Sequence, residues 1–187
     1  MRESRGDIDV KFFDNYAFGM ERGRLRAVSP FPIRRRYLNG MHELLTDVEI
    51  AARPEEVWAV LTDFATYPRW NPFIRYVDGA AEEGRSLEVF IHPPGGRRAS
   101  FRPRVLIADA PRELRWRAHL MVMPGVFEGE HRFLVQPLPN GSVRFEQSER
   151  FSGFLTPLMR DRIDRSISRG FREMNAALKG RVERGGT

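Results

Sequence analysis

Short runs of alternating apolar and polar residues extend from residue 44 to residue 151, with a helical stretch after the first run. Alternation with a period of two indicates strands that bury one face, and prolines and glycines separate the runs. Strands are therefore predicted over 44–51, 73–78, 87–91, 99–107, 114–120, 127–135 and 143–151. Short turns between consecutive strands are typical of an antiparallel meander, so these runs predict one antiparallel sheet of about seven strands.

Two short segments after the first strand carry helical signals. Pro54 stands where a first-turn proline belongs, and Glu55 and Glu56 follow it at the positive end of the helix dipole. Apolar residues then recur at helical spacing as far as Phe64. A second short helix or turn is predicted over 65–72, which contains two prolines.

The segment from Phe154 to about Arg184 is predicted to form one long helix. Its apolar residues recur at steps of mainly three and four and so share one stripe: Leu155, Leu158, Met159, Ile163, Ile167, Phe171, Met174, Leu178 and Val182. Thirty helical residues span about 45 Å, which is enough to cross a sheet completely. Gly170 weakens this helix by about 1 kcal/mol relative to alanine, and close packing explains it better than a kink.

Residues 1–40 show neither the period of two typical of strands nor the period of 3.6 typical of helices. They mix short aromatic runs with glycine and arginine, and end in three consecutive arginines at 34–36. We expect a disordered extension, or upstream sequence translated from a misplaced start that precedes Met41. A basic anchor or partner arm is the less favoured alternative. The domain itself is expected to cover residues 41–184, followed by a tail at 185–187.

Charge and composition narrow the function classes. The net charge is +6, but residues 1–40 carry nine Lys/Arg against five Asp/Glu, which leaves 22 against 20 in the rest of the chain. Because the signs interleave there, no basic face for nucleic acid is expected. The chain has no cysteine, which excludes disulfides, thiolate catalysis and Cys-ligated zinc and favours a reducing cytoplasm. No apolar run is long enough to span a membrane, so integral membrane association is not expected.

Three polar side chains fall on the predicted inner faces of two neighbouring strands. His131 shares a strand face with Phe133, whereas Gln147 and Glu149 share the face of Phe145 on the next strand. If these strands pair, His131 lies near the level of Glu149, and three polar side chains enter one apolar interior. Burial opposes the imidazolium form of histidine, and a nearby carboxylate favours it. Three interpretations stay open: a buried pair that fixes the sheet register, orientation of a polar ligand head, or acid–base catalysis on a carbonyl compound.

Other chemistry has little support in the sequence. The four histidines form no pair with metal-ligand spacing, so no metal is expected. The chain has no nucleophile elbow, so Ser/His/Asp catalysis is not expected. It has no glycine-rich phosphate loop before a helix, and no cofactor is expected.

Several stretches carry a resemblance to a known family: residues 54–64 (PEEVWAVLTDF), 67–73 (YPRWNPF), 114–116 (LRW), 129–133 (GEHRF) and 149–153 (ERFSG). They resemble the START-like SRPBCC superfamily (also called Bet v 1-like), in its bacterial polyketide cyclase/dehydrase-type branch, over about residues 42–183. The resemblance implies an α+β helix-grip fold, with a curved antiparallel sheet of about seven strands, two short helices and one long C-terminal helix packed across it.

The same resemblance implies an apolar cavity between sheet and helix that binds a hydrophobic small molecule such as a lipid, polyketide or isoprenoid-like compound. Two alternatives stand beside it: a polyketide cyclase/dehydrase-type enzyme that uses His131 and Glu149, and a regulatory or interaction module with a filled cavity. Whether the protein is an enzyme therefore stays open. It is expected to act as a monomer or weak homodimer.

The expected ligand contacts lie on the inner faces or at the rim. Trp70 and Asn71 could form the rim, although a turn-capping role is favoured for Asn71. The full set is Trp70, Asn71, Phe73, Val89, Phe101, Val105, Trp116, Leu120, Phe127, Phe133, Phe145, Gln147, Phe151, Ile163, Ile167 and Phe171.

Overall fold

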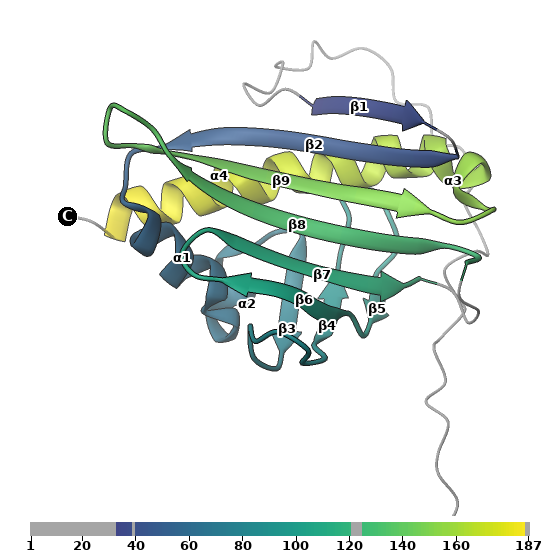
Figure 1. The fold of residues 1–187 in the computed structure, drawn as a ribbon, viewed down its shortest axis with the longest axis horizontal. Coiled ribbons are helices and arrows are strands. Elements are labelled where there is room, and N and C mark those ends of the chain that lie inside the picture. The colour runs from purple at the N-terminus through teal and green to yellow at the C-terminus, as the bar shows by residue number, and fades with distance from the viewer. Residues whose placement is uncertain (1–32, 39, 121–124, 186–187) are drawn as a thin grey trace, which may run out of the picture.

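The computed structural model describes residues 33–38, 40–120 and 125–185 (Figure 1). The strands are β1 Ile33–Leu38, β2 Met41–Ile50, β3 Ile74–Asp78, β4 Glu88–Ile91, β5 Ala99–Phe101, β6 Arg104–Asp109, β7 Glu113–His119, β8 Glu128–Pro137 and β9 Val143–Ser152. The helical elements are α1 Pro54–Thr62, η1 Phe64–Thr66, α2 Tyr67–Trp70, α3 Thr156–Arg162, η2 Ile163–Ile167 and α4 Ser168–Gly185. Residues 1–32 of the expected extension and 186–187 of the expected tail lie outside the described residues.

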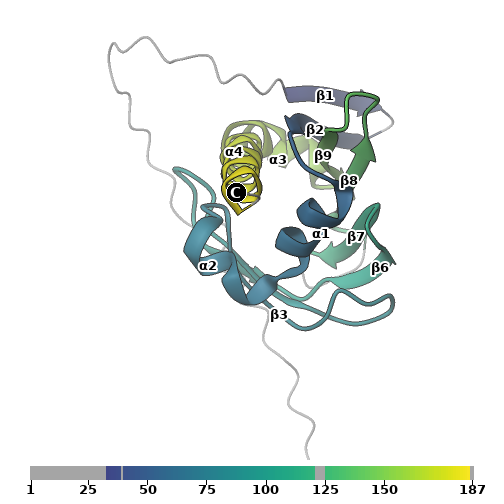
Figure 2. The same cartoon turned by 90° about the vertical axis from the view of Figure 1, so that its left-hand side faces the viewer.

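The strands form two antiparallel sheets around one interior. The six-stranded sheet has the order β1-β2-β9-β8-β7-β6, and the three-stranded sheet has the order β3-β4-β5. Viewed end on, the sheets curve around α4, and α1 and α2 lie at the same end as the C-terminus of α4 (Figure 2). The predicted α+β helix-grip architecture is confirmed, with a long C-terminal helix that crosses a curved antiparallel sheet (Figure 1).

The described residues contain nine strands, whereas about seven were predicted. One difference is the run 99–107, which is divided into β5 and β6 at Pro103 because proline has no N–H to donate to a ladder. The carbonyl of Pro103 still accepts the N–H of Leu87 at 2.9 Å, and Val105 N–H donates to Arg85 O at 2.8 Å. The two sheets are therefore joined by hydrogen bonds where the strand breaks.

The other difference is β1, which lies in the segment expected to be an unstructured extension. β1 pairs with β2 along its whole length, from Ile33 opposite Thr46 to Leu38 opposite Met41. That expectation is corrected for residues 33–38. No periodic pattern signalled this strand because it is an edge strand whose three arginines are exposed.

Asp164, in the C-terminal helix, holds β1 and β2. The Tyr37 hydroxyl donates to Asp164 Oδ2 at 2.5 Å, Arg35 Nε lies 3.2 Å from Oδ1, and His42 Nε2 lies 3.0 Å from Oδ1. The guanidinium of Arg160 stacks over the Tyr37 ring at 4.4 Å. His42 is 1% exposed, and burial lowers its pKa below the ordinary value. One carboxylate thus ties the edge of the sheet to the helix.

The long helix begins at Thr156 and contains an unpredicted π-helical segment, η2, between α3 and α4. Gly170 follows η2 and is buried against Phe73. A Cβ at this position would overlap the Phe73 ring, so the predicted close packing at Gly170 is confirmed. None of the described helices is long and apolar enough to cross a membrane.

Candidate functional site

His131 on β8 and Glu149 on β9 lie directly opposite each other in the sheet register. His131 Nδ1 is 3.5 Å from Glu149 Oε2, and both side chains project from the concave face that α4 covers. The predicted pairing of these strands, with His131 at the level of Glu149, is confirmed. The pairing could be predicted because both strands alternate with a period of two and a short turn joins them. The turn fixes which residues lie opposite each other.

Gln147 occupies the other nitrogen of the imidazole. Its Nε2 lies 3.1 Å from His131 Nε2, and an amide nitrogen can only donate. His131 Nε2 is therefore the acceptor in this contact, and Nδ1 is the nitrogen that faces Glu149. Both nitrogens of His131 are engaged by side chains of β9.

Aromatic rings surround the imidazole. Trp116 stacks on it at 5.4 Å between centroids, Phe171 meets it edge-on at 5.1 Å, and Phe133 lies at 4.5 Å. His131 is consequently only 4% exposed. The ring and both nitrogens of His131 therefore contact other protein groups.

Glu149 is the accessible member of the pair, because 13% of its side chain meets solvent although it lies on the inner face. Leu44, Glu149, His131 and Trp116 lie side by side in one row across β2, β9, β8 and β7. In this row, Leu44 and Trp116 are only 0% and 2% exposed. The carboxylate lies over Gly129, where a Cβ would be only 2.6 Å from Oε1 and 3.1 Å from Leu120 Cδ1. Only glycine at 129 leaves room for this placement of the carboxylate.

Two further polar atoms near this row have no hydrogen-bond partner among the described residues. They are Thr46 Oγ1 and Gln147 Oε1, on side chains that are both 0% exposed. Thr46 is the register partner of Gln147 across β2 and β9. Thr46 was absent from the predicted site, although its alternation with Leu44 and Val48 had placed it on the inner face. Buried polar atoms without partners cost free energy unless water or a ligand satisfies them.

Most of the predicted contact residues are buried. The fully or nearly fully buried ones are Phe73, Val89, Val105, Trp116, Phe127, Phe133, Phe145, Gln147, Phe151, Ile163 and Phe171. Phe127 and Phe151 stack at 5.7 Å. Four others are only partly buried: Trp70, Phe101, Leu120 and Ile167. Contact of these residues with a ligand stays a prediction.

Asn71 is engaged by the backbone. Its Oδ1 accepts the N–H of Phe73 at 3.0 Å and of Ile74 at 2.9 Å, and the residue is fully buried. This is the turn-capping arrangement that was favoured for it. Trp70 packs edge-on against Tyr67 at 5.0 Å, so its ring is held by α2.

A separate surface hollow of about 390 Å³ lies between α1 and the end of α4. Its lining is Glu56, Val60, Arg181, Val182, Arg184 and Gly185. None of these residues belongs to the row of His131 and Glu149. Within the described ranges, no group of three or more His, Asp or Glu side chains could hold a metal ion.

Comparison with known proteins places the chain among proteins of this architecture. A family model described as "Polyketide cyclase / dehydrase and lipid transport" matches residues 41–183. No curated protein matches. Solved structures with a similar fold include the Zhui aromatase/cyclase from Streptomyces sp. R1128, with a TM-score of 0.64 and 19% identity over 79% of this chain and 96% of that one.

Two other solved structures show the same fold. A START superfamily protein from Mycobacterium smegmatis has a TM-score of 0.60 and 22% identity, covering 76% of this chain and 97% of that chain. A norcoclaurine synthase point mutant from Thalictrum flavum, in complex with a transition-state analogue, has a TM-score of 0.58 and 13% identity, covering 81% and 100%. At these identities the likeness concerns the fold alone.

Proposed function

Since the chain belongs to the polyketide cyclase / dehydrase and lipid transport family, we propose that it binds a hydrophobic small molecule between the concave sheet face and the C-terminal helix. The ligand class is a lipid, a polyketide or an isoprenoid-like compound. The protein would act as a monomer or weak homodimer in the cytoplasm, without a metal or cofactor.

One observation carries this proposal: Glu149 lies on the inner face, in a row of buried residues, and its carboxylate still meets solvent. An ionised group on an apolar inner face is costly unless it has partners. His131 supplies one partner at 3.5 Å. The accessible side of the carboxylate is an acceptor suited to a hydroxyl group of a bound molecule.

The charge of Glu149 also constrains the ligand. A carboxylate accepts hydrogen bonds and repels anions, so a neutral ligand with a hydroxyl or enol group fits better than a fatty-acid anion. Leu120 beside Glu149 is partly buried and apolar, as are Phe101 and Ile167. An apolar body that covered these side chains would gain about 25 cal/mol per Å² of apolar area removed from water.

The test is a fluorescence titration with 2-naphthol, a neutral fused-ring hydroxyl compound. Glu149→Gln removes the charged acceptor and is expected to weaken binding about tenfold, the loss typical of a hydrogen bond to a charged group. The matched control is Glu130→Gln on β8, which makes the same chemical change on the outer face, where Glu130 pairs with Arg117 at 2.5 Å. It is expected to leave binding unchanged.

A second pair of variants tests the route to the carboxylate. Leu120→Trp adds bulk beside Glu149 and is expected to reduce binding, whereas His119→Trp adds it on the exposed outer face. Native mass spectrometry of the purified protein would identify any molecule that it retains. If 2-naphthol and the extracted lipids all fail to bind, the alternative of a module with a filled interior replaces this proposal.

The His131–Glu149 pair also favours a second candidate, a cyclase or dehydrase acting on a polyketide-like carbonyl compound. In it, Glu149 would take a proton from an activated carbon, and His131 would hold the carboxylate in place and stabilise its charge. His131 itself has both nitrogens engaged, which makes Glu149 the better base.

This candidate is tested by incubating the protein with a linear poly-β-ketone and analysing the products by mass spectrometry. Glu149→Gln should abolish turnover while binding falls only about tenfold. Glu130→Gln should keep full turnover. Equal product with wild type and Glu149→Gln would exclude the catalytic role and leave the binding proposal standing.

A further inference from the structure

Exposed apolar side chains gather at one end of the molecule. The described residues contain five exposed large hydrophobic side chains, and four of them lie where the β1–β2 connection meets the start of α3. We call this surface the α3 tip; its members are Tyr37 (43% exposed), Met41 (37%), Phe154 (72%) and Leu158 (80%). The fifth, Tyr76, lies on β3.

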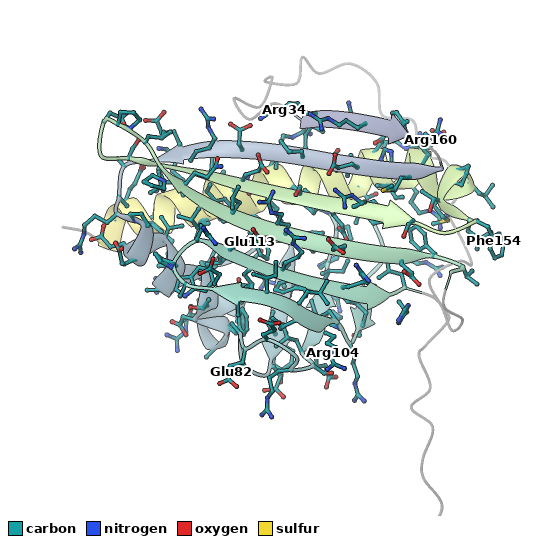
Figure 3. All side chains as sticks on the ribbon, viewed as in Figure 1. Arg34, Glu82, Arg104, Glu113, Phe154 and Arg160 are labelled. Carbon is teal, nitrogen blue, oxygen red and sulfur yellow. The ribbon has the colours of Figure 1, made fainter. Side chains whose placement is uncertain are left out.

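The α3 tip is formed by the β1–β2 connection and the β9–α3 connection, which lie against each other. Met41 begins β2 beside the end of β9, because the next residue, His42, pairs with Phe151. Arg160 of α3 stacks on Tyr37. Figure 3 shows Phe154 and Arg160 at this same end, with Phe154 directed away from the body. Phe154 therefore projects from this end of the molecule rather than lying in a groove.

The segments that form this end are rich in arginine. Residues 33–43 and 150–165 hold seven arginines and three acidic residues. Residues 44–149 and 166–185 together hold 18 basic and 17 acidic residues, so their charges nearly balance. Arg160 and Arg165 are both exposed. An apolar tip beside these exposed arginines is complementary to a surface that carries anionic groups above an apolar layer.

We propose that the α3 tip docks the protein reversibly on an anionic membrane surface. Phe154 and Leu158 enter the interface between headgroups and acyl chains, where aromatic and leucine side chains are favourable. The arginines lie at the level of the anionic headgroups, each contributing to a screened attraction. The docking is peripheral and agrees with the lack of a membrane-spanning helix among the described residues.

The membrane fits this surface better than a second protein does. A stable protein interface needs an area of well over 1,000 Å² with complementary packing, roughly 800 Å² on each partner. Four side chains at one end offer less contact than that, whereas Phe154 and Leu158, the two most exposed of them, can insert individually between lipids. The α3 tip also lies at the end of β9 where Glu149 meets solvent, so docking would bring the accessible side of the interior close to lipid.

The experiment is flotation of the full chain with vesicles of phosphatidylcholine alone and of phosphatidylcholine mixed with phosphatidylglycerol. Wild type should float with the mixed vesicles, and high salt should weaken that binding. The double variant Phe154→Ser/Leu158→Ser should bind these vesicles about tenfold more weakly or less, because two apolar anchors are lost. Tyr76→Ser, which removes an exposed aromatic far from the α3 tip, should bind like wild type.

Charge variants test the contribution of the arginines to docking. Arg160→Glu/Arg165→Glu should lose the preference for anionic vesicles, while Arg181→Glu, near the other end of the C-terminal helix, should keep most of it. Equal flotation of wild type and Phe154→Ser/Leu158→Ser would overturn the proposal. So would a wild-type dimer that the same double variant converts to monomer, with no vesicle binding by either protein.

Failure of the docking proposal can be distinguished from failure of the proposed ligand site. The Phe154→Ser/Leu158→Ser variant should keep its affinity for 2-naphthol in solution, since neither residue contacts the row of His131 and Glu149. Loss of flotation with retained 2-naphthol binding supports the docking role alone. Loss of both would indicate a damaged fold, in which case Arg160→Glu/Arg165→Glu, on exposed positions, decides the docking proposal.

Discussion

The ring of Phe73 lies directly on the backbone of Gly170, at the point where the start of β3 passes under the C-terminal helix. The same ring meets Phe171 edge-on at 5.7 Å. The absence of a side chain at Gly170 thus sets how closely the helix approaches the second sheet.

Gly170→Ala should lower the free energy of unfolding. Because a Cβ at position 170 would overlap Phe73 Cδ2, overpacking is expected to cost about 3 kcal/mol, the upper end of the usual range. This outweighs the gain of about 1 kcal/mol that alanine brings to a helix. Gly180→Ala is the control in the same helix, because its new Cβ would meet only the flexible end of Arg184, 3.0 Å away. That variant should be neutral or more stable. Urea unfolding measures both, and a stabilised Gly170→Ala would contradict the close contact.

Asn71→Ala should destabilise the fold by about 1–3 kcal/mol, because two buried backbone N–H groups lose their acceptor. The affected donors belong to Phe73 and Ile74. Asn71→Asp keeps an oxygen in that position and should lose less. If Asn71→Ala instead kept full stability and lost 2-naphthol binding, Asn71 would be a ligand contact rather than a turn cap.

Tyr37→Phe should loosen β1 without unfolding the domain. The lost hydrogen bond to Asp164 is expected to be worth about 1 kcal/mol, and amide exchange in β1 should accelerate accordingly. Tyr76→Phe is the matched control, since no described group hydrogen-bonds its exposed hydroxyl. Unchanged exchange in β1 of Tyr37→Phe would show that strand pairing alone holds it.

The stability should depend on pH through His42. Burial lowers the pKa of His42 from the ordinary 6.5, and the Asp164 carboxylate only partly offsets this; Arg160 and Arg35 act in the same direction as burial. The unfolded chain therefore binds the proton more readily. The free energy of unfolding should be highest above pH 6.5 and should fall as the pH falls through the folded-state pKa.

Urea unfolding at about pH 7.5 and about pH 5.5 measures this effect. His42→Gln should show a smaller loss between the two conditions than wild type, while His119→Gln, at an exposed position, should behave like wild type. A loss of equal size in wild type and His42→Gln would assign the pH dependence to other groups.

The sequence could predict the register of His131 and Glu149 because both strands have one strict period and a short turn between them. It placed the apolar stripe of the C-terminal helix for the same reason. These parts follow from local patterns that a single buried face imposes on the chain.

Other parts depend on contacts that no local pattern records. β1 is held by pairing with β2 and by Asp164, which is 127 residues away from Tyr37. The orientation of Gln147, which engages one nitrogen of His131, is a matter of side-chain geometry that alternation does not specify. η2 interrupts a stripe whose spacing is compatible with an uninterrupted helix.

The pairing of β2 with β9 has a consequence for the order of events during synthesis. Residues 42–50 find their partners at 143–151, and the carboxylate that holds β1 follows later still, at Asp164. β2 must therefore leave the ribosome about a hundred residues before the strand that pairs with it, and non-local pairing of this kind slows folding. Until β9 emerges, one edge of β2 is open to pairing with other chains. Its other edge is occupied by β1, whose exposed arginines discourage further pairing.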